Sequence, residues 1–220
     1  EQSEPLTINV TELPEATALN NGPVCVGDVV QLFAGDVVGG TYFWYDSDPQ
    51  SSPPGMLIST DQNPQIFDLS EGTHNFWLLV QSNECTSNTA ALTSVVVHPQ
   101  PVLSGLSGSG SYCEGANITL SAINTVPLSG NVVYTWTGPN GFNFSGTTGW
   151  EGPFSVVLPN VSTEVEGTYT LNITSSAGCT AEAQSVNIDL DGVPLTPTLS
   201  INNDFLCEGE LLELNTDAYT

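Results

Sequence analysis

The residues of this chain whose side chains are best suited to chemistry are its five cysteines, which recur with a regular spacing. Cys25, Cys113 and Cys207 each open a Cys-x-Gly sequence, and Cys85 and Cys179 follow the first two of these sequences. The separations between them are far longer than those of zinc ligands, so a zinc site is not indicated. Paired cysteines in small β domains indicate disulfides that form in an oxidising, extracytoplasmic setting.

Two pairings of these cysteines are open. The natural pairs within each copy are Cys25 with Cys85 and Cys113 with Cys179, which leaves Cys207 with a partner outside the chain. In a plain immunoglobulin order, however, the first cysteine of each pair and the second lie at opposite ends of the sandwich, and disulfide geometry does not span that distance. Either the strand order differs or a bridge joins neighbouring domains. We expect the pairing within domains.

Catalytic chemistry is poorly supported by the other reactive side chains. The histidines, His74 and His98, both fall in the first copy, so the second copy lacks a general base. We expect His74 to replace a core aromatic residue at a strand corner and His98 to pack at a domain joint. Acid pairs such as Glu164 with Glu166 have the residue type that glycoside hydrolysis needs, but we expect them on exposed turns. The chain is therefore expected not to be an enzyme.

One group of acidic residues could bind calcium, because Ca²⁺ takes six to eight oxygen ligands, largely carboxylates and carbonyls. These residues lie around the joint between the second domain and the third copy: Asp189, Asp191, Asp204, Glu208 and Glu210. A bound ion would stiffen that joint and offset charge repulsion. The segment from Pro99 to Ser111 contains no acidic residue, which argues against a calcium site at every joint.

The charge balance is extreme and restricts the partners. The chain of 220 residues has no lysine or arginine, 24 acidic residues and a formal charge of −24. Nothing can neutralise phosphate, so we expect no nucleic-acid partner, and no apolar run is long enough for membrane insertion. Two interpretations of the acidity remain: solubility of an exposed surface protein, and resistance to proteases that cleave after lysine or arginine.

The cysteine sequences mark a repeat with starts 88 and 94 residues apart, from 25 to 113 and from 113 to 207. This period predicts residues 1–10 as the last strand of a preceding repeat, 11–98 and 99–191 as two complete domains, and 192–220 as the opening strands of a third, truncated repeat. We expect the chain to be an internal piece of a longer array, whose next residue after Thr220 is aromatic.

Short alternating apolar runs separated by turn residues predict an all-β fold of tandem immunoglobulin-like β-sandwich domains arranged end to end. In the second domain the expected strands are 101–105, 115–123, 131–137, 142–145, 154–158, 168–175 and 181–190. Trp44 and Trp136 stand where a sandwich keeps its central aromatic residue. Tyr169 follows Gly167-Thr168 and is expected in the core as a tyrosine corner.

Two sequences in the second domain resemble a known class of repeat. Trp136-Thr137-Gly138-Pro139-Asn140-Gly141-Phe142, and Gly167-Thr168-Tyr169-Thr170 followed by Ala177-Gly178-Cys179-Thr180, are similar to immunoglobulin-like and PKD-like repeats of giant Bacteroidota surface adhesins. The resemblance extends to adhesins of the SprB gliding-motility type, which the type IX secretion system exports. The first domain departs from the pattern at Glu84, where the family commonly has glycine, and at His74, which replaces the tyrosine.

The resemblance implies a stalk or adhesive repeat segment of a long extracellular adhesin, associated with the outer membrane and used for surface attachment and gliding. The implied partners are neighbouring repeats of the same chain, surface polysaccharide or protein receptors, and the secretion and gliding machinery. The alternatives are a spacer or carbohydrate-binding module of a secreted enzyme, a eukaryotic adhesion ectodomain, and a subunit of a surface filament.

Overall fold

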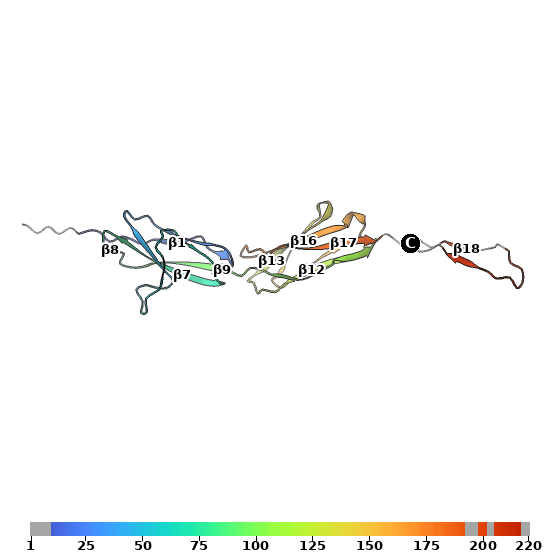
Figure 1. The fold of residues 1–220 in the computed structure, drawn as a ribbon, viewed down its shortest axis with the longest axis horizontal. Helices are drawn as coiled ribbons and strands as arrows, with labels where there is room; N and C mark the ends of the chain where they lie inside the picture. The colour runs from blue at the N-terminus through green and yellow to red at the C-terminus, as the bar shows by residue number, and fades with distance from the viewer. Residues whose placement is uncertain (1–9, 192–197, 202–204, 217–220) are drawn as a thin grey trace, which may run out of the picture.

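The computed structural model describes residues 10–191, 198–201 and 205–216, and it shows two β-sandwiches in a row followed by a hairpin (Figure 1). Within these residues there is no α-helix, and only two 3₁₀ turns interrupt the strands and loops. The predicted all-β fold of tandem immunoglobulin-like domains, arranged end to end, is confirmed. In the same part of the chain no helix is long and apolar enough to cross a membrane.

The first sandwich is built from β1 to β9. Its strands are β1 (Ala18–Asn20), β2 (Val24–Cys25), β3 (Val30–Ala34), β4 (Thr41–Tyr45), β5 (Leu57–Ser59), β6 (Gln65–Ile66), β7 (Gly72–Ser82), β8 (Cys85–Thr86) and β9 (Ala91–His98). One sheet has the order β1-β3-β6 and the other the order β2-β9-β7-β4-β5, with β8 paired to the end of β7. The strands are antiparallel except that β2 runs parallel to β9.

The second sandwich repeats this topology. Its elements are β10 (Leu103–Ser107), β11 (Gly110–Cys113), β12 (Ile118–Asn124), β13 (Asn131–Thr137), η1 (Pro139–Gly141), β14 (Asn143–Gly149), β15 (Val156–Leu158), η2 (Thr163–Val165), β16 (Gly167–Ser175) and β17 (Gln184–Asp191). The sheets are β10-β12-β15 and β11-β17-β16-β13-β14, with β11 parallel to β17. The sequence prediction located these strands except β11, the short parallel strand that carries Cys113.

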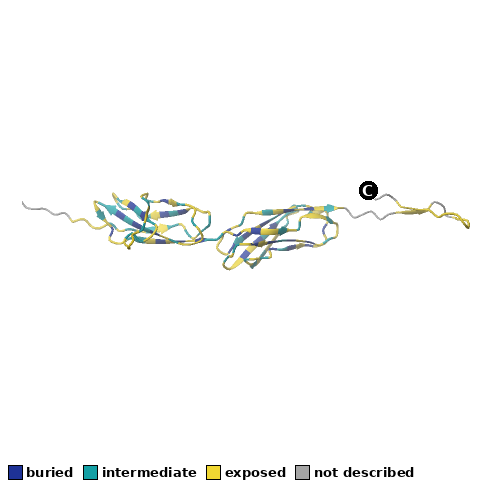
Figure 2. Cartoon of the chain, turned by 60° about the horizontal axis from the view of Figure 1, so that its bottom comes forward, coloured by how far each residue is buried: buried dark blue, intermediate teal, exposed yellow. Residues whose placement is uncertain are grey.

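Alternation of apolar and polar residues explains why each strand buries one face (Figure 2). In β16 the side chains of Tyr169, Leu171 and Ile173 are buried, while Asn172 between them is exposed. The same alternation fills both cores, so two separate apolar clusters form, one in each sandwich.

A tryptophan lies at the centre of each core and is fully buried. The indole Nε1–H of Trp44 donates to the Gln62 carbonyl at 3.3 Å, and that of Trp136 donates to the Phe154 carbonyl at 3.1 Å. These bonds satisfy the one polar group of each indole, which a dry core requires. In each sandwich the acceptor lies in the segment just before an edge strand of the other sheet, β6 in the first domain and β15 in the second.

Each Cys-x-Gly sequence forms a tight turn that requires its glycine. In the first copy the Asp28 N–H donates to the Cys25 carbonyl, and Gly27 has φ = 92°, a conformation that a residue with a Cβ rarely adopts. The bond from Glu210 N–H to the Cys207 carbonyl closes the same turn in the third copy. The repeated sequence is therefore a repeated backbone turn, which fixes where each cysteine lies.

Of the residues predicted to open a third repeat, the structure describes the hairpin of β18 (Leu199–Ile201) with β19 (Leu214–Thr216). Its exposed apolar side chains include Leu199, Leu212 and Leu214. The predictions for residues 1–9, for Asp204 and for the last four residues lie outside the described residues.

Candidate functional site at the domain joint

A disulfide crosses the joint between the two sandwiches. It joins Cys25 of the first domain to Cys179 of the second, with 5.7 Å between their Cα atoms and a sequence separation of 154. The Cα separation lies within the usual disulfide range. The two domains are therefore held by two covalent connections, the peptide chain and this bridge.

The expected pairing within each domain is wrong for both of these cysteines. Cys25 lies opposite His98 at the joint end of the first sandwich, near Gly72 of the adjacent strand, whereas Cys85 lies opposite Ser82. Ten residues of β7 (82 − 72) separate these positions, a distance of about 33 Å at ~3.3 Å per residue. A disulfide cannot span it, so the alternative of a bridge between neighbouring domains is the one observed.

Cys25 is positioned by its turn and by the last strand of its domain. Its backbone N–H donates to the carboxylate Oδ2 of Asp28 at 2.9 Å, and the Val26 N–H donates to the His98 carbonyl at 2.9 Å. These bonds tie the turn to the point where the chain leaves the first domain. The Cys25 sulfur is thereby held at the joint, where it bonds Cys179 of the second domain.

Cys179 is positioned by the loop that joins β16 to β17. Its N–H donates to the hydroxyl oxygen of Ser175 at 3.1 Å, and its carbonyl accepts from the Ser175 N–H at 2.8 Å. Gly178 has φ = 88°, which lets the loop turn tightly before the cysteine. Cys179 is 1% exposed, so the bridge is shielded on this side.

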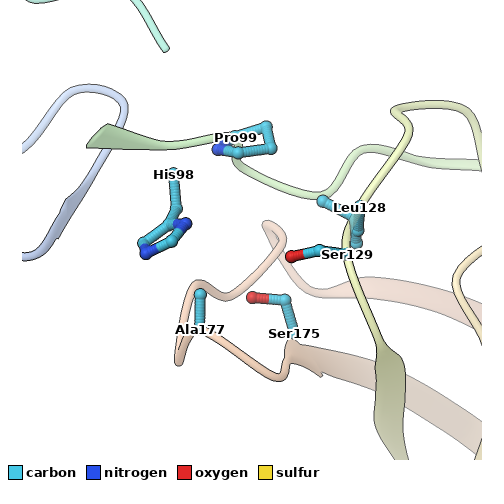
Figure 3. A pocket seen from close by; sticks show the side chains of 6 residues that line it. All are labelled: His98, Pro99, Leu128, Ser129, Ser175 and Ala177. Carbon is cyan, nitrogen blue, oxygen red and sulfur yellow. The ribbon is translucent and has the colours of Figure 1, made fainter. Parts of the chain in front are cut away.

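A small hollow of about 10 Å³ lies between the domains (Figure 3). It is lined by His98 and Pro99 of the exit strand, and by Leu128, Ser129, Ser175 and Ala177 of the second domain. Side chains from both domains thus face one another here. The predicted joint position of His98 agrees with this arrangement.

The linker itself is anchored to the second domain by a buried asparagine. Asn124 is 3% exposed, and its Oδ1 accepts from the Val102 N–H at 2.8 Å while its amide donates to the carbonyls of Val126 and Trp150. Pro101, also buried, precedes this anchor. The four-residue connection from Pro99 to Val102 is held at both of its ends, so it does not act as a free hinge.

The remaining cysteines lie at other ends of the two sandwiches and are unpaired among the described residues. Cys85 is half-buried on β8, at the end of the first domain away from the joint (Figure 1). Cys113 is exposed on β11, opposite Asp191 at the far end of the second domain. Cys207 is exposed in the third Cys-x-Gly turn.

The acidic residues proposed for calcium fall on two separate elements where they are described. Asp189 and Asp191 are exposed on β17, and Glu208 and Glu210 lie in the third turn. The carboxylates of Asp189 and Glu210 bind protein groups, the Asn187 amide and the Cys207 N–H respectively. No group of three or more potential metal ligands occurs within the described residues, and the calcium site stays a prediction.

The two histidines are not arranged around a nucleophile. The Nε2–H of His74 donates to the Ser70 carbonyl at 2.7 Å, and His98 lies at the joint. Asp46, near His74 in a second hollow, accepts from the Met56 N–H at 2.8 Å and the Ser47 hydroxyl at 2.9 Å. These polar groups maintain turns and loops.

Sequence reasoning missed the parallel strands β2 and β11, and with them the position of the cysteines. A usable signal is the acidic residue three positions after Cys25 and Cys207, Asp28 and Glu210, which accepts from the cysteine N–H in both copies. It marks a turn next to an edge strand.

Comparison with solved structures supports the fold. The chain is similar to Drosophila OTK extracellular domains 3–5, with TM-score 0.52 and 14% identity over 81% of this chain and 63% of that one. It is also similar to the I-band fragment I67–I69 from titin, with TM-score 0.40 and 14% identity over 76% of this chain and 62% of that one. A third match is the fibronectin(III)-like modules of Clostridium thermocellum CbhA, with TM-score 0.40 and 15% identity over 80% and 95%.

The match to OTK, the one of these three with a TM-score above 0.5, bears on the class of fold and not on a family. At 14% identity the match to OTK shows the fold alone, and this chain spans less than two thirds of that structure. No family model matches the chain, and no curated protein matches it. The protein is a tandem of immunoglobulin-like β-sandwiches. The disulfide is consistent with an extracellular location.

Proposed function

We propose that this chain is a stalk segment of a long extracellular adhesin, which holds adhesive parts away from the cell surface. The observation that carries the proposal is the Cys25–Cys179 bridge across the joint. A bridge inside a domain stabilises that domain alone, whereas a bridge between domains fixes their relative orientation. A rod that has to extend a set distance from the cell surface needs a fixed orientation between neighbouring domains.

The charge of the chain supports the same role. With no lysine or arginine, the surface repels other copies of itself and offers no cleavage site to trypsin-like proteases. Both properties suit a segment exposed outside the cell. Neither property requires a ligand, so the segment is proposed to space and display, with any adhesion spread over many weak copies.

Stiffness of the joint is tested by small-angle X-ray scattering of the chain before and after reduction. We expect the oxidised chain to give a single extended shape, with the two sandwiches about 70–90 Å long on ordinary strand dimensions. Reduction, or the change Cys179→Ser, is expected to broaden the distribution of maximum dimensions. Equal distributions in oxidised, reduced and Cys179→Ser samples would contradict a role of the bridge in stiffness.

Attachment to the cell surface, export by the type IX system and movement by gliding machinery are parts of the proposal that the sequence resemblance motivates. The test is labelling of intact cells of the native source with an antibody fragment against residues 11–191. We expect labelling without permeabilisation, and labelled sites that move along gliding cells. Labelling that appears only after lysis would contradict the location.

A spacing role also predicts that the segment neither hydrolyses nor strongly binds polysaccharide. We expect no retention of the oxidised chain in affinity electrophoresis through gels that contain native surface polysaccharides. Specific retention, or release of sugars, would favour a carbohydrate-binding module or an enzyme.

A further inference from the structure

Cys85 and Cys113 lie at the two outer ends of the domain pair, beside the points where the chain enters and leaves it. The hydroxyl oxygen of Thr11, on the incoming segment, lies 3.7 Å from the Cys85 sulfur. At the other end Cys113 pairs in register with Asp191, the last residue of β17. Each thiol is therefore placed where a neighbouring domain would attach.

The bonded cysteines occupy the same positions at the joint between the two domains. Cys25 pairs in register with His98 at the end of β9, as Cys113 pairs with Asp191. Cys85 and Cys179 both follow the turn after the long strand β7 or β16. Thr11 is the equivalent of Pro99, because it lies 88 residues before it, the same offset as from Cys25 to Cys113. Thr11 lies beside Cys85, and Pro99 lines the joint hollow with Ser175 and Ala177, in the loop that leads to Cys179.

We propose that Cys85 and Cys113 each form the same kind of bridge with the neighbouring domains of the same protein, so that every joint is cross-linked. Cys85 bonds the Cys-x-Gly cysteine of the domain before it, and Cys113 bonds the cysteine that follows the turn in the third domain. This inference rests on the proposed function, because it requires domains on both sides.

Formation of each bridge balances as a thiol–disulfide exchange. Two protein thiols lose two protons and two electrons and form one S–S bond, and an oxidising disulfide of the extracytoplasmic compartment is reduced to two thiols. The turn that positions Cys25 recurs in the third copy, where the Cys207 N–H donates to Glu210 Oε2 at 2.9 Å, as the Cys25 N–H does to Asp28.

The pattern determines which part of the chain would carry a pulling force. Force that arrives at Cys85 through its bridge passes along the chain to Cys113 and leaves through the next bridge, a path of 28 residues (113 − 85). The path from Cys179 to Cys207 is also 28 residues (207 − 179). The first path runs through β9, the linker, β10 and β11, and so along the whole length of both domains.

This covalent path is nearly taut in the folded state. Twenty-eight extended residues measure roughly 95 Å at ~3.4 Å per residue, and two sandwiches end to end measure about 70–90 Å. A fully cross-linked array could therefore lengthen by only about 5–25 Å per pair of domains before covalent bonds bear the load. Two such paths would run side by side, and each joint would be crossed by one peptide linker and one disulfide.

The bridges are tested by a non-reducing peptide map of the protein isolated from its native source, with free thiols blocked before denaturation. Chymotrypsin is suitable because Leu92 and Tyr112 lie between Cys85 and Cys113, and because trypsin finds no site in this segment. We expect Cys85 and Cys113 in disulfide-linked peptides whose partners are cysteines of adjacent domains. Blocked free thiols at these positions, a Cys85–Cys113 bond, or bonds to a second copy would overturn the inference.

Single-molecule pulling of the same native protein tests the mechanical consequence. Unfolding of one uncross-linked domain of about 90 residues releases roughly 300 Å of chain. We expect steps of that size after reduction and none before it. Steps of full domain length in the oxidised protein would overturn the taut-path inference. Free thiols at Cys85 and Cys113 in the peptide map would overturn the proposed bridges and leave the stalk role intact. Absence of the segment from the cell surface would overturn the stalk role but not the bridges.

Discussion

Tyr169 and His74 make the same contact in the two domains: each side chain donates a hydrogen bond to the backbone carbonyl four residues before it. The Tyr169 hydroxyl reaches the Val165 carbonyl at 2.9 Å, and the His74 Nε2–H reaches the Ser70 carbonyl at 2.7 Å. The sequence predicted a tyrosine corner in the second domain and a substituted corner in the first. A different side chain thus supplies the same bond at the corner before the long strand.

Tyr169 gives the second domain a dependence on alkaline pH, because burial raises the pKa of its phenol. The folded state holds this proton more tightly than the unfolded chain. The contribution is fully present below about pH 10, the unfolded value, and is lost as the pH rises through the higher folded pKa. We expect the denaturant concentration at the unfolding midpoint of the second domain to decrease as the pH rises above 10. The chain has no lysine whose titration would obscure this.

The matched variant is Tyr169→Phe, which removes the proton and the hydrogen bond. It is expected to lower the unfolding free energy at pH 7 by about 1 kcal/mol and to flatten the alkaline dependence. Denaturant unfolding from pH 7 to pH 11 measures both. An unchanged slope above pH 10 in this variant would assign the effect to another group.

The disulfide is expected to stabilise both domains, since each domain that unfolds alone would still be closed into a loop by the bridge. For the second domain the loop runs from His98 to Cys179, or 81 residues (179 − 98). The chain-entropy relation gives about 4.5 kcal/mol for that length. Cys179→Ser should lower the unfolding free energy by as much, while Cys85→Ser should change it by less than about 0.5 kcal/mol. Equal losses in the two variants would contradict the pairing.

Glu84 is held in a conformation that favours glycine. It has φ = 65°, after Asn83 with φ = 49°, in the two-residue turn between β7 and β8. Glu84→Gly should raise the unfolding free energy of the first domain by about 0.5–1 kcal/mol, because relief of this strain exceeds the entropy that glycine adds to the unfolded chain. Glu84→Ala removes the same charge but keeps a Cβ. A gain as large in the alanine variant would show that charge, and not conformation, is the cause.

Asn124 anchors the linker with a buried side chain that bonds four backbone groups, so its truncation removes all four bonds. Asn124→Ala is expected to cost about 2–4 kcal/mol in denaturant unfolding. The control is Asn187→Ala, which removes two exposed bonds, to Asp189 and to the Thr168 hydroxyl, and should cost less than about 0.5 kcal/mol. Similar costs at the two positions would contradict the anchoring role of Asn124.

Self-repulsion among 24 acidic residues, with no lysine or arginine to pair them, should make stability rise with salt. Screening between 10 mM and 300 mM NaCl is expected to add on the order of 1 kcal/mol to the unfolding free energy. A double variant with two exposed acids reversed, Glu151→Lys and Glu182→Lys, should respond less. A salt response that is absent, or larger in this variant, would contradict repulsion as the cause.

Much of the fold followed from local patterns. Alternation located the strands of the second domain, and the Gly-Thr-Tyr sequence located the corner at Tyr169. The cysteine pairing did not follow, because spacing along the chain does not say at which end of a sandwich a residue lies. That depends on the short strand β2, which holds Cys25 beside His98 through two pairs of residues only. Such a strand is too short for a periodic signal.

The central claim is tested most directly by a non-reducing peptide map of this chain after oxidative refolding, with free thiols blocked. We predict one disulfide-linked pair of peptides, which contain Cys25 and Cys179, and blocked thiols at Cys85 and Cys113. Bonds of Cys25 to Cys85 and of Cys113 to Cys179 would contradict the account, because the bridge would then stabilise separate domains and leave the joint free to bend.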